Sequence, residues 1–274
     1  MFEEFEGNGF ELTAENYYSK EANTEYMSVS QYKDFAGSYG KHGCEAAALA
    51  VMKGEWQTEA TTAMMVGSYV DAFFEGTLSD FRNNHPEMFK RDGALKAEFC
   101  KAEDMIARAT RDELFSKYMS GEKQVIMTGE LFGAKWKIKM DSYIPETAIV
   151  DLKCMASLTE QKWVKDLGYL DFVRYWGYDL QGAVYQEIVY QNTGLRLPFF
   201  IAGISKEKEP NIEIINVTND YLREALSEIE RTLPIVLAAK NGEREPSRCE
   251  CCDYCRHTKV LRKPIGIGEL AMSL

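Results

Sequence analysis

The middle of the chain contains the seven-residue run Lys135-Trp136-Lys137-Ile138-Lys139-Met140-Asp141, in which polar and apolar side chains alternate strictly. A period of two is typical of a β-strand that turns one face toward a core. Residues 148–154 have the β-branched apolar content of a second strand, and Pro145 lies where the chain has to turn between the two. The two segments together predict a hairpin.

Segments of helical character surround this hairpin. Ser28-Val29-Ser30-Gln31 has the form of a capping box that opens a short helix, and apolar residues recur at helical spacing from Glu59 to Glu75. The same criteria predict helices over 44–53, 98–117, 175–190 and 220–239, and strands over 198–204 and 212–217. The central order of helix, three strands (about 123 to 153), helix and strand predicts an α/β fold with a mixed sheet.

Length and composition bound the domain organisation. The 274 residues are 45% hydrophobic, which is enough for a core of ordinary size, and neither an internal repeat nor a linker divides them. We expect a single domain over 1–274. Its parts would be an N-terminal helical segment (1–58), a core (59–205), and a C-terminal strand, helix and cysteine cluster (206–274).

Charge and the first residues bear on location and partners. The chain carries 43 acidic and 32 basic residues, a net charge of −11, so no global positive field draws it to nucleic acid or to an anionic membrane. The start, Met1-Phe2-Glu3-Glu4-Phe5-Glu6, is acidic where a signal peptide would be basic, and no apolar run approaches the length of a membrane span. We expect a cytoplasmic protein without a membrane partner.

Three charged residues lie close together in the predicted hairpin. Asp141 ends the first strand, while Asp151 and Lys153 stand two apart on the second and therefore share one face. Metal-assisted phosphodiester hydrolysis requires carboxylates that hold Mg²⁺ and an ammonium that orients the attacking water. Charges on a solvated face are the alternative, but Ile149-Val150-Asp151-Leu152-Lys153 sets them in an apolar strand, where unpaired charge is costly.

This arrangement resembles the PD-(D/E)xK nuclease superfamily. Asp141, followed ten residues later by Asp151-Leu152-Lys153, matches its D…(D/E)xK signature. Gln181 and Tyr185 resemble the QxxxY motif of its RecB-type and lambda-exonuclease-like branches. Gly67-Ser68-Tyr69-Val70-Asp71 resembles their GxxxH/D motif, with Asp71 where His is usual. The resemblance covers about residues 60 to 205 and is greatest to phage and prophage exonuclease VIII (RecE-like) domains.

The resemblance implies a restriction-endonuclease-like core and an Mg²⁺- or Mn²⁺-dependent exonuclease that degrades linear DNA in phage or prophage recombination. The implied metal ligands are Asp71, Asp141 and Asp151. By their positions in the sequence, Glu75, one turn from Asp71, and Glu130, just before the alternating strand, could each add an auxiliary acid, and of the two we favour Glu130. Lys153 would position the water, and Gln181 and Tyr185 would contact the DNA. Further expected partners are copies of the same chain, since related exonucleases form rings around DNA, and a single-strand annealing recombination protein.

The cysteines are unevenly distributed, with four of the seven in Cys249-Glu250-Cys251-Cys252-Asp253-Tyr254-Cys255. Thiolates this close in a reducing compartment favour a metal site. Cys249, Cys252 and Cys255 resemble three ligands of AddB-like iron–sulfur nucleases, in which an earlier cysteine, here Cys44, completes a [4Fe–4S] site. That one-plus-three layout favours the cluster, although four thiolates also suit Zn²⁺. Cys251 could replace Cys249, and a local zinc knuckle with His257 would leave Cys44 as a buried apolar residue.

An acidic chain needs local positive charge to bind DNA, because phosphate neutralisation dominates affinity. Candidates are the lysines of the alternating strand, together with Lys206, Lys208, Arg256, Lys259, Arg262 and Lys263. Two other functions fit part of the pattern. One is a module that grips DNA or a recombination partner without cleaving it, its tail stabilised by Zn²⁺ or an iron–sulfur cluster, and the intact acidic pair with Lys153 argues against it. The other is an unrelated enzyme, such as one that cleaves RNA, with a zinc-dependent interaction element.

Overall fold

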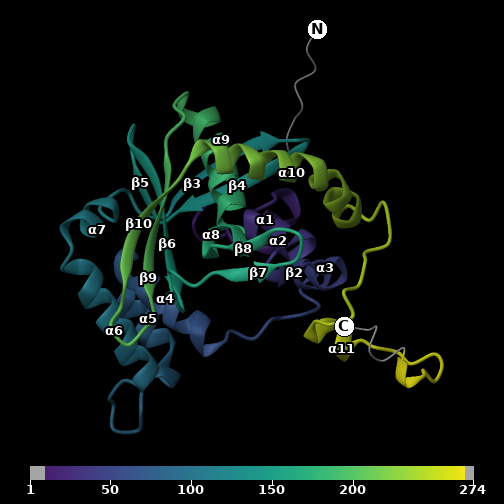
Figure 1. Ribbon diagram of the computed structural model, residues 1–274, viewed down its shortest axis with the longest axis horizontal. Coiled ribbons are helices and arrows are strands. Elements are labelled where there is room, and N and C mark those ends of the chain that lie inside the picture. The colour runs from purple at the N-terminus through teal and green to yellow at the C-terminus, as the bar shows by residue number, and fades with distance from the viewer. Residues whose placement is uncertain (1–9, 269–274) are drawn as a thin grey trace.

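The computed structural model describes residues 10–268 and places a β-sheet between two layers of helices (Figure 1). Four strands form the sheet in the order β10-β9-β6-β5, and they are β5 Ser142–Ile144, β6 Ala148–Met155, β9 Phe199–Ser205 and β10 Ile212–Val217. The middle pair, β6 and β9, is parallel, whereas both outer pairs are antiparallel. The predicted α/β fold with a mixed sheet is confirmed.

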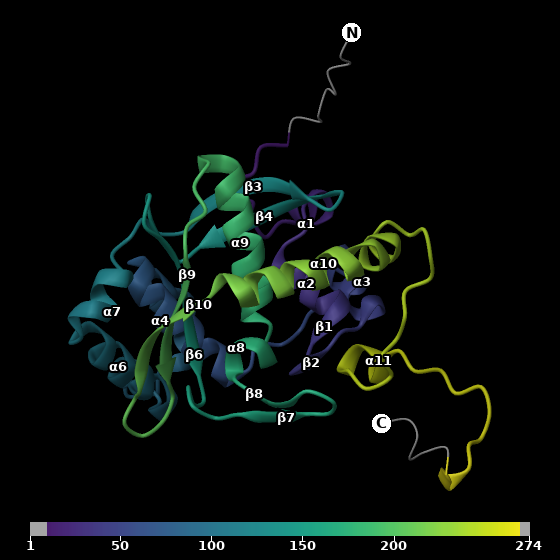
Figure 2. The ribbon, with the colours of Figure 1, turned by 45° about the horizontal axis from the view of Figure 1, so that its top comes forward.

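The helices cover both faces of this sheet (Figures 1 and 2). In chain order they are α1 Lys20–Glu25, α2 Val29–Ala36, α3 Glu45–Lys53, α4 Thr62–Glu75, α5 Leu78–Asn84, the 3₁₀ turn η1 Pro86–Met88, α6 Ala97–Thr110, α7 Glu113–Tyr118, α8 Phe172–Tyr175, α9 Tyr178–Thr193, α10 Asn219–Lys240 and α11 Asp253–His257. The predicted helical N-terminal part and the C-terminal position of the cysteine-rich segment are confirmed.

Each face of the sheet has its own cluster of buried side chains. Helices α2, α9 and α10 pack on the face that carries Ile149 and Phe199. Helices α4, α6 and α7 pack on the other face, against Val150 and Leu152. Because side chains alternate across a strand, β6 contributes residues to both clusters. By the same alternation, Asp151 and Lys153 are directed to the first face.

The central hairpin differs from the prediction in its pairing. The alternating strand, β4 (Ala134–Met140), pairs with β3 (Val125–Leu131) in a separate two-stranded sheet. The chain leaves β4 at Asp141 and continues as the short β5, which pairs with β6 across the turn that begins at Pro145. The predicted pairing of 135–141 with 148–154 is therefore wrong, because periodicity identifies a strand but not its partner.

The polar face of β4 is largely covered by the N-terminal segment. Met27 N donates to Lys135 O (2.7 Å), and Lys137 N donates to Met27 O (2.9 Å). The Lys137 side chain is 1% exposed, and its ammonium donates to Tyr17 O and to Asn23 Oδ1. The lysines expected to form a stripe for DNA are thus in part structural.

Most predicted helices are present with small shifts at their ends. Helix α2 begins after Ser28, whose Oγ accepts from Gln31 N (3.2 Å), as the capping box requires. The single helix predicted over 98–117 is two helices, because Asp112 caps a new one by accepting from Phe115 N (2.9 Å).

Two short hairpins have no counterpart among the predicted elements: β1 Gly37–Ser38 with β2 Lys41–His42, and β7 Lys162–Val164 with β8 Gly168–Leu170. Strands of two or three residues are too short to show a period. Among residues 10–268, no helix combines the length and apolar character needed to cross a membrane. The acidic start at residues 1–6 lies outside the described residues.

Candidate active site and four-cysteine centre

The charged residues of β6 and its neighbours meet at one pocket. The pocket has a volume of about 350 Å³ and lies where the ends of β4 and β6 approach helices α2, α4 and α9. Its lining includes six of the predicted site residues: Asp71, Asp141, Asp151, Lys153, Gln181 and Tyr185. A second pocket of about 280 Å³ shares Asp71, Lys153 and Tyr178 with the first, so open space continues past Lys153 toward α4.

Asp151 is the most buried acid of the pocket, with 2% of its surface exposed. Its Oδ1 accepts from Gln181 Nε2 (2.6 Å). Its Oδ2 forms an ion pair with the Lys153 ammonium and has no other polar partner within residues 10–268. A buried carboxylate oxygen with unused lone pairs fits a metal ligand, because Mg²⁺ and Mn²⁺ prefer such oxygens.

Asp141 lies opposite Asp151 at the break between β4 and β5. Its Oδ2 accepts from Leu152 N (2.8 Å), which fixes the carboxylate against β6. Burial, together with the negative charge of Asp151, raises the pKa of Asp141 to about 7. Two carboxylates held this close repel each other, and a divalent cation between them would remove the repulsion.

Helix α4 adds acidic side chains from the other side. Asp71 lines the pocket, and burial followed by the charge of Asp141 raises its pKa well above the ordinary value. Glu75, one turn further along α4, lines a small cavity together with Asp71 and Asp141. Its charge contributes to the raised pKa values of both aspartates. The acidic group of the site is therefore Asp71, Glu75, Asp141 and Asp151.

Lys153 supplies the positive charge of the pocket. Burial opposes its charged form, but the carboxylates of Asp151 and Asp141 outweigh burial and raise the pKa of its ammonium. The ammonium also lies 4.9 Å from the centre of the Tyr178 ring. It pairs with Asp151, one of the carboxylates that would hold a metal ion, so a metal bound there would compete with this ion pair.

Gln181 and Tyr185 are on one face of α9, as their spacing of four predicts. Gln181 orients Asp151 through the hydrogen bond described above. The Tyr185 hydroxyl donates to Lys139 O (3.0 Å), which ties α9 to β4 close to Asp141. Both side chains thus hold the strands that carry the carboxylates.

Glu130 is not part of this group. It is exposed and pairs in register with Lys135, whereas the pocket lies at the opposite end of the ladder, where Val125 pairs with Met140. Five residues of a strand span roughly 17 Å, too far for a shared ion. Of the two acids considered as an auxiliary ligand, Glu75 lies beside Asp71 and Asp141, and Glu130 does not.

One basic residue of the pocket was not a candidate from the sequence. Lys33, in the middle of α2, lines the pocket next to Asp151 and Lys153. A single lysine in a short amphipathic helix carries no sequence signal that separates it from a solvated lysine, so only the fold identifies it.

The raised pKa of Asp141 makes a prediction about stability. A carboxyl whose pKa rises from 3.8 to about 7 on folding costs stability as the pH rises from about 4 to about 7, because the folded chain then has to lose the proton it favours. In EDTA at pH 8, Asp141→Asn should therefore melt several degrees above the wild type, while the two should differ little at pH 4.

Differential scanning fluorimetry across this pH range measures the effect. The matched control is Asp220→Asn on α10, a carboxylate whose side chain is 85% exposed, for which no change is expected. A wild type more stable than Asp141→Asn at pH 8 in EDTA would contradict the prediction.

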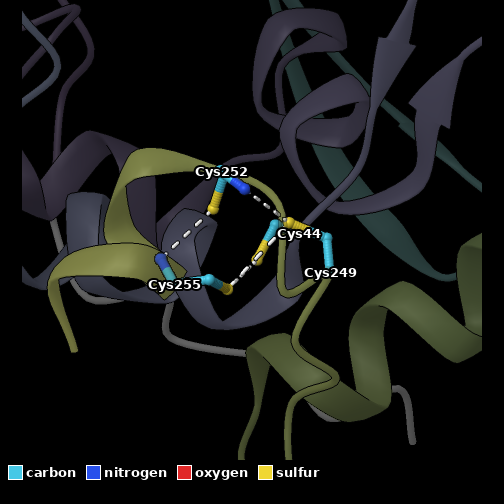
Figure 3. A group of neighbouring side chains, drawn as sticks. All are labelled: Cys44, Cys249, Cys252 and Cys255. Atoms are coloured by element: carbon cyan, nitrogen blue, oxygen red, sulfur yellow. Dashed lines mark hydrogen bonds between the residues drawn. The ribbon is translucent and has the colours of Figure 1, made fainter. Parts of the chain in front are cut away.

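The second candidate centre is formed by four cysteines, Cys44, Cys249, Cys252 and Cys255 (Figure 3). Their sulfur atoms lie within 4.8 Å of one another, with 3.6 Å between Cys44 and Cys255 and 3.9 Å between Cys249 and Cys255. Within the described residues, no comparably tight group includes the active-site carboxylates. The one-plus-three combination expected from the sequence is thus brought together, with Cys249 and not Cys251.

The chain around these cysteines orients the sulfurs. Cys249 Sγ accepts from Cys252 N (3.3 Å), and Cys252 Sγ accepts from Cys255 N (3.4 Å). Burial opposes the thiolate of Cys249, but the backbone N–H groups of Cys251 and Cys252 outweigh it and lower its pKa to about 6. Backbone donors directed at sulfur are the second layer of contacts that tunes metal thiolates.

The sulfur spacing tests which centre fits. Around one tetrahedral ion with metal–sulfur bonds of about 2.3 Å, sulfurs lie roughly 3.8 Å apart. The distances of 3.6 and 3.9 Å match that value. A [4Fe–4S] cluster attaches each thiolate to a different iron atom and needs the sulfurs further apart. The residues fit both groups in type, and the spacing of these two sulfur pairs fits a single ion.

Comparison with known proteins agrees with the fold and the motifs. The family model of a PDDEXK-like domain of unknown function (DUF3799) matches residues 28–258. The crystal structure of a candidate exonuclease from Eubacterium rectale is 65% identical, with a TM-score of 0.94, and the match covers 97% of this chain and all of that one.

Neither a second solved structure nor the curated proteins provide a further relative of the chain. The crystal structure of SSO0001 is 12% identical, with a TM-score of 0.30, over 78% of this chain and 92% of its own, which is too low to indicate a shared fold. No curated protein matches the chain. Because the family model spans most of the sequence, the chain belongs to the PDDEXK-like DUF3799 family.

Proposed function

We propose that this protein is a metal-dependent exonuclease that hydrolyses phosphodiester bonds of linear DNA. The observation that carries the proposal is the meeting of Asp71, Asp141, Asp151 and Lys153 at one open pocket. Membership of a PDDEXK-like family and 65% identity to a candidate exonuclease support it. The motif order and the pocket also argue against a module that only grips DNA, since binding alone would not require buried acids that repel each other.

The proposed metal ligands are Asp71, Asp141 and Asp151, with Glu75 in place of Glu130 as the auxiliary acid. A bound Mg²⁺ or Mn²⁺ would stabilise the charge on the scissile phosphate and lower the pKa of the attacking water. Lys153, released from Asp151, would then position that water or neutralise the phosphate. Its placement beside the metal ligands on β6 supports this role.

Gln181 and Tyr185 act by position in this proposal. The 2.6 Å hydrogen bond from Gln181 sets the Asp151 carboxylate, and Tyr185 holds α9 against β4. Neither hydrogen bond leaves the side chain directed freely at a substrate. We therefore assign to them the support of the metal ligands, and not the direct DNA contact that the QxxxY resemblance suggested.

The chain would act as a single nuclease domain whose ends are joined by the four cysteines. The resemblance further supports a role in phage or prophage recombination in the cytoplasm, with other copies of the chain and a single-strand annealing protein as partners. Linear duplex DNA is the substrate proposed, in preference to RNA, because the motifs resemble those of DNA exonucleases.

For the four-cysteine centre, two groups are supported by different observations. The one-plus-three distribution along the chain supports a [4Fe–4S] cluster, and the sulfur spacing supports one Zn²⁺. Anaerobically purified protein decides between them. Brown protein containing iron and inorganic sulfide would identify the cluster, and colourless protein with one zinc per chain would identify the ion.

A cleavage assay tests the function. Purified protein with Mg²⁺ should shorten end-labelled linear duplexes progressively and leave covalently closed circles intact, and EDTA should stop the reaction. The labelled end that disappears first gives the polarity. Nicked circles would instead indicate an endonuclease, and a lack of cleavage by protein with a complete four-cysteine centre would refute the nuclease proposal.

A further inference from the structure

Lys33 is a half-buried cation that the proposed mechanism does not use. Its ammonium donates to Trp176 O (3.1 Å) and Gly177 O (3.5 Å), at the junction of α8 and α9. No carboxylate of the described residues lies within ion-pair distance of it. Burial and the neighbouring charge of Lys153 lower its pKa to about 8. A cation that is partly withdrawn from water and donates only to carbonyl oxygens among the described residues would be stabilised by a ligand that supplies negative charge.

The position of Lys33 relative to Lys153 is defined by a shared aromatic ring. The two ammonium groups lie 5.1 and 4.9 Å from the centre of the Tyr178 ring. Tyr178 borders both pockets of the site, so the two cations flank the open space at which the carboxylates are gathered. A strand bound with one phosphate at the acidic group would bring a neighbouring phosphate to this side.

The N-terminus of helix α2 is a second feature of the pocket that favours an anion. Ser28, the N-cap of the eight-residue helix α2, and Ser30 in its first turn line the pocket, and so does Lys139 of β4. A helix N-terminus carries a partial positive charge and adds to the field of a nearby lysine. The pocket thus has basic and polar groups in its lining beside the acids.

We propose that Lys33 and the first turn of α2 form a second phosphate subsite, which binds the phosphodiester next to the one that is cleaved. This inference rests on the proposed function and names how its substrate is gripped. It assigns to Lys33 substrate binding and not the chemical step, so its loss should raise KM and leave kcat nearly unchanged.

Binding and cleavage of a linear duplex by Lys33→Met test the subsite. We expect about a tenfold rise in KM, a change in kcat of less than about threefold, and a slope of log affinity against log salt that is less steep by about 0.7 to 0.9, as for one lost phosphate contact. Binding is measured with Ca²⁺ in place of Mg²⁺. Lys33→Arg should restore most of the affinity. Lys41→Met, an exposed lysine of β2, is the matched control and should behave as wild type.

The possible outcomes distinguish phosphate binding by Lys33 from a purely structural role. A Lys33→Met protein with a lower melting temperature, a lower kcat and an unchanged salt slope would show that Lys33 only joins α2 to the α8–α9 junction, and the subsite would be refuted. Wild type that cleaves DNA no better than Lys33→Met would refute the subsite alone. Wild type that binds DNA but never cleaves it, with the slope reduced in Lys33→Met, would refute the nuclease proposal and retain the subsite.

Discussion

Asp151→Asn is expected to lower the rate of Mg²⁺-dependent DNA degradation at least roughly a thousandfold, because a metal ion at the phosphate contributes several kcal/mol to the transition state. Asp151 is central to the acidic group: Gln181 donates to one of its oxygens and Lys153 pairs with the other. An amide in its place carries no charge, so it holds the metal weakly and leaves Lys153 without its partner. Initial rates on end-labelled linear duplex measure the loss.

The fold should survive this change. Asn has nearly the same volume as Asp, and its amide oxygen can still accept from Gln181. Circular dichroism should therefore remain that of the wild type, while the melting temperature should fall by a few degrees because the Lys153 ammonium loses its ion-pair partner. Asp220→Asn on the exposed side of α10 serves as the matched control and should retain full activity. Undiminished cleavage by a clean Asp151→Asn preparation would end the assignment of the pocket as the active site.

Cys44→Ala is the second change for which we expect a large effect, a complete loss of the bound metal or cluster and a fall in melting temperature of about 10 °C. Cys44 immediately precedes α3, while its three partners lie more than 200 residues later in the chain. Metal binding free energy at such a site is folding free energy, because the unfolded chain does not hold the four thiols together. Other contacts also join α3 to the C-terminal segment, among them the ion pair of Glu45 with Arg244 and the hydrogen bond from Ser247 N to Glu45 Oε2, so the fold should be destabilised but not lost.

Two other cysteines provide controls for this effect. Cys251, in the same cluster of the sequence but outside the four-sulfur group, should be replaceable by Ala without loss of metal, and so should the exposed Cys100 on α6. Metal content by elemental analysis and thermal melting give the two readouts. Full metal content in Cys44→Ala would mean that the C-terminal cysteines bind the metal locally, with His257 as the remaining ligand.

The sequence was sufficient to predict the strand of the candidate site that carries Asp151 and Lys153, because β6 has a recognisable pattern of its own. Apolar side chains on both sides of Asp151 and Lys153 identify a buried strand, and the spacing of two places both charges on one face. The partner of that strand was not predictable in the same way. Pairing depends on contacts between distant residues, so β4 was assigned to β6 although the chain bends at Asp141 and only β5 reaches it.

Residues of the site differ in how far the sequence could identify them. Asp71 was identified through a motif, and its neighbour one helical turn away, Glu75, follows from helix geometry. The choice of Glu130 as an auxiliary ligand was wrong, because Glu130 lies at the end of the β3–β4 ladder that is far from the pocket. Its closeness to β4 along the chain did not show which end of the ladder faces the site. Lys33 belongs to no motif. It lines the pocket because α2 packs against the α8–α9 junction. No local property of the sequence reports such a contact.

The alternation of apolar and charged side chains along β6 disfavours pairing with β9 in a shifted register. In the native register Asp151 and Lys153 lie opposite Ile201 and Gly203 of β9. A slip by one residue would direct both charges into the apolar layer under α4 and α6 and turn Leu152 toward the pocket. Burying two charges there would cost several kcal/mol. The same two side chains that belong to the candidate active site therefore also favour the correct alignment of β6, and a chain that reaches its stable alignment brings the pocket residues of β6 into place in the same event.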